Sequence, residues 1–472
     1  MSKNNEMQKL INHNKLKAIG SLIIILVLFI FGVIWTLTTR PSIGAYGADF
    51  LRKVIGNQAV VRLETLLFTL QDHLQQIEYR VGLKKPVNPW SATDESYPAS
   101  SLSTSQAEDG RVNQPPTGIL TQVIPTEDRP GNPSLTQIPA VEITRGITST
   151  QEQSSGTVTP NPPLHENNCD PNSTDPSAQH CLINKSQAGD ISAWLLPTIQ
   201  PSGNVEGEGI WQPYLLNKYQ RVVAYRTFVV PDPQRPYVLV AIVAFDMEYT
   251  RLHYVIGFQD PYDPEIIQRT KGSIAPIHLK SGILLAAFNG GFKYEHGKFG
   301  SMADGLVSVH PRDNLATLAI YQDGRIQIGA WGHEIMPSDD LVAFRQDGPL
   351  VIQNGEVATQ VNDSKYWGFT LTGGTVTWRS GLATDSLGKT LYYFAGPDLS
   401  IQTLANAMST VRPHMAMQLD INNYWVHFVK ILAQADQLIA EPLFPGKVMS
   451  DRVDRYLWPY SRDFFYITSW DH

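Results

Sequence analysis

RVVAYRTFVVPDPQRPYVLVAIVAF, residues 221–245, is the stretch that decides the fold class. It contains two runs rich in β-branched and aromatic residues, which are separated by Pro231, Asp232 and Pro233. Runs of this kind, bounded by turn residues, are typical of β-strands, and a third run, RLHYVIGF at Arg251–Phe258, follows soon after. The sequence therefore predicts consecutive strands near the start of a globular domain.

The same signals recur further along the chain. Gly282–Phe288 is another apolar run, and Ala316–Trp331 predicts a hairpin with an Asp-Gly turn. A helix is predicted at Ser400–Val411, where apolar residues recur on one face, and the apolar strand MAMQLDI follows it. We therefore expect an α+β fold, with a strand-rich C-terminal domain at 205–472 built on mixed or antiparallel sheet.

Composition excludes several classes of function. The 472 residues carry a formal net charge of −7, whereas nucleic-acid-binding domains are usually basic. The two cysteines, Cys169 and Cys181, are too few for a cysteine-rich zinc site, and the histidines show no metal-ligand spacing. Nucleotide-binding loops and the common hydrolase motifs are absent from the sequence as well. We expect no nucleic-acid partner, no metal and no cofactor.

One segment near the N-terminus predicts a membrane anchor. Residues 18–39, AIGSLIIILVLFIFGVIWTLTT, form an uncharged run of 22 residues, and about 20 apolar residues cross a bilayer as a helix. Four lysines precede the run and Arg40 is the only charge close behind it, so residues 1–17 are expected in the cytoplasm and the rest outside. The alternative is a cleaved signal peptide, whose apolar region spans only about 7–15 residues. We expect an uncleaved single-pass anchor in the cell membrane.

Two segments separate this anchor from the domain. Residues 49–80 predict a membrane-proximal helix, because leucine and isoleucine recur at spacings of three, four and seven. Three interpretations of this predicted helix remain open: a stalk, a self-associating helix, or an amphipathic helix that rests on the bilayer or on the domain. Residues 86–201 hold half of the 32 prolines and predict a disordered linker. Cys169 and Cys181 lie within it, as a local disulfide or as free thiols.

Glycines follow a predicted strand in AAFNGGF, Ala286–Phe292. Gly290 and Gly291 allow the backbone to approach a ligand closely, and their amides can bind an anion. Asn289 can donate and accept hydrogen bonds at the strand end. Local chemistry alone favours a plain turn.

Two charged residues stand in or at the end of predicted apolar strands. Arg379, in WRSG, has a guanidinium suited to bidentate binding of phosphate or carboxylate, and a structural salt bridge is the alternative. Asp420 ends the strand MAMQLDI, where a carboxylate can serve acid/base chemistry, and a turn-capping aspartate is the alternative.

Taken together and in order, the motifs of the C-terminal domain resemble the phosphodiester glycosidase family. The resemblance covers residues 237–428 and rests on six stretches in the family's order. These are FNGGF at Phe288–Phe292, ADG at Ala303–Gly305, DGPLVIQNG at Asp347–Gly355, WRSGLATD at Trp378–Asp385, AGPDLSIQTLANAM at Ala395–Met408 and LDINN at Leu419–Asn423.

The resemblance implies a hydrolase that cleaves a sugar-1-phosphodiester, or a related glycosidic bond, in envelope or extracellular glycans. It implies catalytic roles for Asp420, Asn289 and Arg379. Substrate-binding roles are implied for Gly290, Gly291, Asp304, Asp385, Asn422 and Asn423.

One departure from the family pattern matters for this expectation. Where the family has LDGGGS, this chain has an aspartate followed by Ile421, Asn422 and Asn423. Side chains therefore stand where the family backbone approaches substrate freely. The alternative expectation is a catalytically degenerate homologue that binds cell-envelope polysaccharide.

Overall fold

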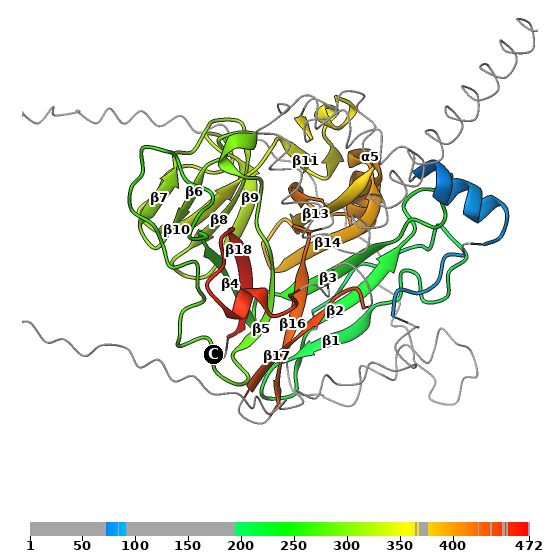
Figure 1. The fold of residues 1–472 in the computed structure, drawn as a ribbon, viewed down its shortest axis with the longest axis horizontal. Coiled ribbons are helices and arrows are strands. Elements are labelled where there is room, and N and C mark those ends of the chain that lie inside the picture. Colours follow the sequence, from blue (N-terminus) through cyan, green and yellow to red (C-terminus); the bar gives the residue numbers. More distant parts are fainter. Residues whose placement is uncertain are drawn as a thin grey trace, which may run out of the picture. The chain divides into compact units, whose positions relative to one another are not determined.

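The computed structural model describes residues 72–83, 85–90, 194–363, 366–367, 376–422, 424–434, 437–445, 449 and 452–470. In this part of the chain antiparallel sheets dominate and helices are few (Figure 1). Every pairing between its named strands is antiparallel. The strand-rich antiparallel character expected from the sequence is confirmed.

The largest sheet has eight strands in the order β1-β2-β3-β14-β13-β15-β11-β12. They are β1 (Gln212–Leu216), β2 (Val222–Val229), β3 (Val240–Asp246), β11 (Leu350–Gln353), β12 (Glu356–Val357), β13 (Thr377–Thr384), β14 (Thr390–Leu399) and β15 (Met415–Ile421). The two runs of residues 221–245 are thus β2 and β3, which pair with each other.

Both faces of this sheet are covered, which explains why β3 is apolar from Val240 to Phe245. All seven of its residues are buried. On one face Ile242 and Phe394 pack in a core with Leu404 of helix α5 (Ile401–Ser409), which is the helix predicted at 400–411. Figure 1 shows α5 beside β13 and β14. Phe245 faces the opposite core, which the eight-stranded sheet shares with a second sheet.

This second sheet has five strands in the order β17-β16-β5-β18-β4. They are β4 (Thr250–Val255), β5 (Leu284–Asn289), β16 (Phe428–Gln434), β17 (Gln437–Pro442) and β18 (Phe464–Ser469). The rings of Phe288 and Phe428 stack with centroids 5.9 Å apart, and they lie 6.4 Å and 6.1 Å from the ring of Phe245. This aromatic cluster joins the two sheets through apolar burial.

A third sheet has five strands in the order β7-β6-β10-β8-β9. They are β6 (Ser301–Ala303), β7 (Leu306–Val309), β8 (Ala316–Tyr321), β9 (Ile326–Ala330) and β10 (Leu341–Gln346). The predicted hairpin at 316–331 is β8 and β9, and Gly324 takes the left-handed φ of 86° in its turn. Three short 3-10 helices complete the named elements: η2 (Tyr294–His296), η3 (Thr359–Asn362) and η5 (Arg455–Leu457).

Residues from both ends of the expected linker pack on the domain. Trp90 is only 7% exposed, and its indole Nε1 donates to the carbonyl of Leu443 at 2.8 Å. Trp194 packs against the core cluster that contains Ile242 and Phe394, and its Nε1 donates to the Thr390 hydroxyl at 3.0 Å. Burial of such aromatic side chains is favourable, so it holds the backbone at these positions despite the neighbouring prolines. Trp90 and Trp194, which lie within the linker expected at 86–201, therefore both contact the domain.

Several predicted features lie outside the described residues. They are the cytoplasmic tail 1–17, the anchor 18–39, the first part of the helix 49–80, and both cysteines. Residues 72–80, the described part of that segment, are helical. Among the helices that are described, none is long and apolar enough to cross a membrane.

Candidate active site

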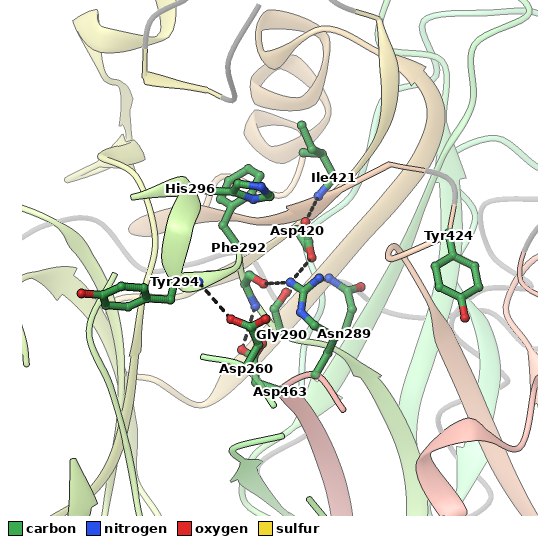
Figure 2. Close-up of polar contacts among 12 residues, drawn as sticks. Asp260, Asn289, Gly290, Phe292, Tyr294, His296, Asp420, Ile421, Tyr424 and Asp463 are labelled. Carbon is green, nitrogen blue, oxygen red and sulfur yellow. Dashed lines mark hydrogen bonds and ion pairs between the residues drawn. The ribbon is translucent and has the colours of Figure 1, made fainter. Parts of the chain in front are cut away.

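Buried polar residues from all three sheets converge at the ends of their strands. Asp420 lies at the end of β15, Asn289 ends β5, Asp463 directly precedes β18, and Asp347 directly follows β10. All four are buried. Figure 2 shows Asp420, Gly290 and Asp463 gathered at this junction. The sequence-predicted Asp420 and the NGG motif are therefore brought together.

A β-bulge presents the side chain of Asp420. Between β13 and β15, the step from Arg379 to Gly381 is matched by the longer step from Ile421 to Gln418. The extra residue lies in β15, and a bulge of this kind bends a strand and re-aims its side chains. Asp420 lies within the bulge, which directs it to the junction of the sheets.

The Asp420 carboxylate is held by one cation and one amide. Its Oδ2 accepts from Nη2 of Arg462 at 2.7 Å, and its Oδ1 accepts from the amide of Ile421 at 2.8 Å (Figure 2). Burial raises the pKa of Asp420 to about 6, with a further contribution from the negative charge of Asp463, while Arg462 and the Ile421 amide oppose the rise. A carboxyl group with this pKa can exchange a proton near neutral pH.

The two glycines of the NGG motif contact Asp463 of the protein itself. The Gly291 amide donates to Oδ2 of Asp463 at 3.0 Å, and the Gly290 amide donates to the Asp463 backbone carbonyl at 3.1 Å. A Cβ on Gly290 would lie 2.1 Å from Asp463 Oδ2, so only glycine fits. The expected close approach is present, and in this structure both amides are bonded to Asp463.

Asp463 is in turn paired with a buried arginine. Its Oδ2 accepts from Nε of Arg345 at 2.7 Å and from the hydroxyl of Tyr254 at 3.2 Å. The other Arg345 nitrogens donate to the carbonyls of Gln346 and Phe292. This pair locks β10 of the third sheet to the start of β18 in the second.

Asp347 adds a third buried carboxyl group. Its Oδ2 lies 2.6 Å from the position that a Cβ on Gly291 would take, and neither of its oxygens has a hydrogen-bond partner among the described residues. Burial raises the pKa of Asp347 well above its usual range; Asp420 and Asp463 add to the rise, and Arg345 and the nearby Phe292 amide oppose it. The shift favours the neutral carboxyl group, which can donate as well as accept a hydrogen bond.

Asn289 has no hydrogen-bonding capacity left for a substrate. Its Oδ1 accepts from the Tyr393 hydroxyl at 2.9 Å and from the His427 amide at 3.2 Å. Its Nδ2 donates to the carbonyl of Gly290 and to the hydroxyl of Ser380, both at 2.9 Å. An asparagine side chain makes four hydrogen bonds at most. Asn289 therefore positions the strand ends, and its expected contact with substrate is not supported by this geometry.

Arg379 is bound within the protein by backbone carbonyls. Its Nε donates to Leu399 O at 2.9 Å, and its Nη1 donates to Trp367 O at 2.9 Å and to Oε1 of Gln418 at 2.6 Å. Burial lowers the pKa of Arg379 to about 10. Through these bonds the guanidinium ties β13 to β14, to β15 and to Trp367.

The two weaker carboxylate candidates lie elsewhere. Asp385 caps the β13–β14 turn, where its Oδ1 accepts from the amides of Leu387 and Lys389 at 3.0 Å. This turn is at the far end of β13 from Arg379, about 20 Å away at roughly 3.3 Å per residue. Asp304 is exposed in the β6–β7 turn with a left-handed φ of 50°. Both are turn residues, because short polar side chains tolerate such conformations.

Asn422 keeps a backbone conformation that suits glycine. Its φ is 89°, its amide donates to Trp378 O at 2.9 Å, and its Oδ1 accepts from the Tyr424 amide at 3.2 Å. Asparagine is one of the few residues with a side chain that adopt positive φ readily. The loop after Asp420 therefore turns without the family's glycine at this position, and Asn423 lies outside the described residues.

Sequence reasoning missed Arg345, Asp347, Arg462 and Asp463. A signal was available, because in LVAFRQDGP and SRDFFYI the charged residues border runs that the sheets bury. The same signal pointed to Asp420. Their pairing was hidden by distance along the chain, since Arg345 and Asp463 are 118 residues apart. No group of three or more metal-ligating side chains is arranged for an ion within the described ranges.

Comparison with known proteins finds only distant likeness. No protein-family model matches the sequence, and no curated protein matches it significantly. Among solved structures, the chain is similar to the zebrafish N-acetylglucosamine-1-phosphodiester alpha-N-acetylglucosaminidase catalytic domain auto-inhibited by its pro-peptide: identity is 14%, coverage is 56% of this chain and 88% of that chain, and the TM-score is 0.34. A hypothetical protein from Synechocystis is 10% identical over 55% of this chain and 62% of that chain, with a TM-score of 0.28. These are distant structural relationships and do not establish membership of a family.

Proposed function

We propose that this protein is a hydrolase that cleaves a sugar-1-phosphodiester, or a related glycosidic bond, in cell-envelope or extracellular glycans. The observation that carries the proposal is Asp420, a buried carboxyl group at a strand end with a pKa of about 6. It lies on the LDINN stretch that resembles the family's catalytic motif. Two further buried carboxyl groups, Asp347 and Asp463, surround the same junction.

The proposed roles follow from the charge state of each group. Glycosidic cleavage uses carboxyl groups to protonate the leaving group, to activate water or to attack the anomeric carbon. A phosphate monoester is a good leaving group, so protonation of the leaving group contributes less. The main proposed role of Asp420 is therefore to act as a base or as the nucleophile. The bond between the anomeric carbon and the phosphate oxygen breaks, and its electron pair leaves with the phosphate. Asp347, whose pKa is raised by burial, is the proton donor proposed nearby.

Arg462 is the group proposed to meet the negative charge of the phosphate. Its Nη2 is shared between Asp420 Oδ2 and the carbonyl of Gly291, and its buried Nε has no partner among the described residues. Its guanidinium also lies 4.5 Å from the centre of the Trp425 ring. A planar cation with a spare donor is suited to binding phosphate oxygens.

A turnover assay tests this proposal. The full-length protein is incubated with chromogenic sugar-1-phosphodiesters, with and without a chelator, and release of the sugar is followed. Release in wild type that disappears in Asp420→Asn supports the proposal. Absence of release at high protein concentration across the panel refutes it.

A second candidate is a module that binds envelope polysaccharide without cleaving it. The observation that favours it is internal saturation: the Gly290 and Gly291 amides and all four hydrogen bonds of Asn289 are used within the protein. One assay distinguishes the two candidate functions. A module retains labelled glycan in a pull-down and releases no sugar, whereas the hydrolase releases it.

We also propose that the domain lies outside the cytoplasm on an anchor at residues 18–39. The uncharged run and the lysines before it support this arrangement. Protease added to intact cells should then digest the domain. Protection in intact cells, with digestion after lysis, contradicts the orientation.

A further inference from the structure

The helix at residues 72–80 rests on the domain through one face only. Asp72 Oδ1 accepts from Nη1 of Arg235 at 3.1 Å, and both side chains are largely buried. The ring of Tyr79 lies 5.7 Å from the ring of Tyr237. The helix ends at Gly82, whose φ is 79°, and the Leu83 amide donates back to Glu78 O at 2.8 Å. This is a Schellman ending, so the orientation of the last turns is well defined.

The opposite face of this helix is apolar and exposed. Leu74, Ile77 and Val81 are 57%, 55% and 62% exposed. Their spacing of three and four places them on one stripe. The exposed positions of the helix are 73, 74, 77, 78, 80 and 81, whereas 72, 75, 76 and 79 are half-buried against the domain. Half of the helix is therefore covered by its own chain, and the apolar half is not.

The exposed stripe has the register of a coiled coil. From Val60 to Val81 the sequence has an apolar residue at every alternating step of three and four, namely Val60, Leu63, Leu67, Leu70, Leu74, Ile77 and Val81, and Val61, Leu66 and Phe68 are apolar outside this series. In heptad notation Leu74 and Val81 are a positions and Ile77 is a d position. The exposed positions listed by number above are then g, a, d and e, the four that face a partner helix. The residues that dock on the domain, Asp72 and Tyr79, are both f, on the side opposite a partner.

The charges of the helix favour another helix over a lipid surface. Helices that lie on membranes carry a lysine- and arginine-rich polar face. Residues 60–81 contain two arginines, no lysine and three acidic residues. Within the described residues 72–81 the exposed apolar side chains Leu74, Ile77 and Val81 occupy only a and d positions, a narrow stripe as in a coiled-coil seam.

We propose that this stripe is the site at which a second copy of the chain binds, through a parallel two-stranded coiled coil seated on Leu74, Ile77 and Val81. The parallel arrangement places the two domains at the same end of the helix pair. It also places both N-terminal segments at the other end, as two copies anchored in one membrane require.

Disulfide cross-linking tests the pairing and its direction. In full-length protein with Cys169 and Cys181 replaced by serine, Leu74→Cys places a thiol at an a position, which meets its own counterpart only in a parallel pair. Oxidation in isolated membranes should give a covalent dimer. The matched control is Gln76→Cys, two residues away on the half-buried side, which should remain monomeric. Equal cross-linking of the two variants overturns the proposal.

Sedimentation of the full-length protein in detergent provides a second readout. Wild type should have twice the protein mass of one chain, and the double variant Leu74→Glu with Ile77→Glu should have half the wild-type mass. Because both side chains are exposed in the single copy, thermal unfolding of the domain should not change. A monomeric wild type, or a double variant that remains a dimer, overturns the proposal. If wild type is a monomer that binds lipid vesicles and the double variant does not bind them, the stripe contacts lipid. This outcome also overturns the proposal.

Discussion

Two buried arginine–aspartate pairs lie at the same junction, and they leave different kinds of atom without a partner. In Arg345–Asp463 the side chains are 0% and 1% exposed, Oδ2 of the carboxylate accepts from an arginine, an amide and a hydroxyl, and Oδ1 has no partner among the described residues. In Arg462–Asp420 they are 6% and 8% exposed, each carboxylate oxygen has a single donor, and Arg462 Nε has no partner among the described residues. The first pair holds two sheets together and leaves an acceptor, whereas the second leaves a cationic donor, which suits an anionic ligand.

The largest expected effect is on turnover when the second pair loses its charge. Asp420→Asn is nearly isosteric, so the fold should persist, and the rate should fall by about 10²–10⁴, the usual contribution of an acid/base group. The matched control is Asp385→Asn, a carboxylate that caps a turn at the far end of β13 and retains an acceptor oxygen after the change. Steady-state kinetics on both proteins provide the comparison. Wild-type turnover in folded Asp420→Asn removes this residue from the mechanism.

Stability should separate the two pairs next. Arg345→Met strands Asp463 as a buried anion, and loss of one partner of a buried pair costs about 3–5 kcal/mol of unfolding free energy. Arg462→Met should cost less, because Asp420 already has a pKa of about 6 and can take up a proton when its partner is removed. Urea unfolding at pH 7 measures both. Equal losses contradict the distinction between a structural pair and a reactive pair.

The pH dependence sharpens the account of Asp420. A base must be ionised, so activity should rise as the pH increases through about 6. The folded-state pKa lies above the usual value of 3.8, so ionising Asp420 opposes folding, and its contribution to stability decreases from about pH 4 to 6 and is constant above. In Arg462→Lys the weaker fork geometry should move the acidic limb of the rate profile upward. A limb that stays at the same pH in this variant shows that Arg462 does not tune Asp420.

The smallest expected effect concerns the loop that carries Asp420. Asn422 has a φ of 89°, so Asn422→Ala should cost about 1–2 kcal/mol, the price of a left-handed conformation for a residue with an ordinary side chain. Asn422→Gly should stay within about 1 kcal/mol of wild type. Thermal unfolding with both variants gives the order. If alanine is tolerated as well as glycine, the loop relaxes and does not fix the position of Asp420.

Local signals predicted several strands correctly and pointed to Asp420, but they did not predict the partners of each charged group. MAMQLDI was predicted as a strand ending in a carboxylate, and it is β15 with Asp420 in its bulge. The NGG glycines were correctly linked to close backbone approach. The group that approaches, Asp463, lies 172 residues from Gly291, and no local pattern reports a contact across that separation. Arg379 and Asp385 belong to one sequence motif and were both predicted at the site. The strand β13 nevertheless separates them, because Arg379 lies near its start and Asp385 directly follows its end.

The seating of Trp90 bears on how the protein responds to cleavage. Trp90 and Trp194 both pack in the same folded body. Should a protease cut the chain between residues 91 and 193, the two pieces would therefore stay associated through Trp90 and the Asp72–Arg235 ion pair. Shedding of the domain would need a second event, the withdrawal of an indole from the core. Retention after nicking is thus an expected property of this chain.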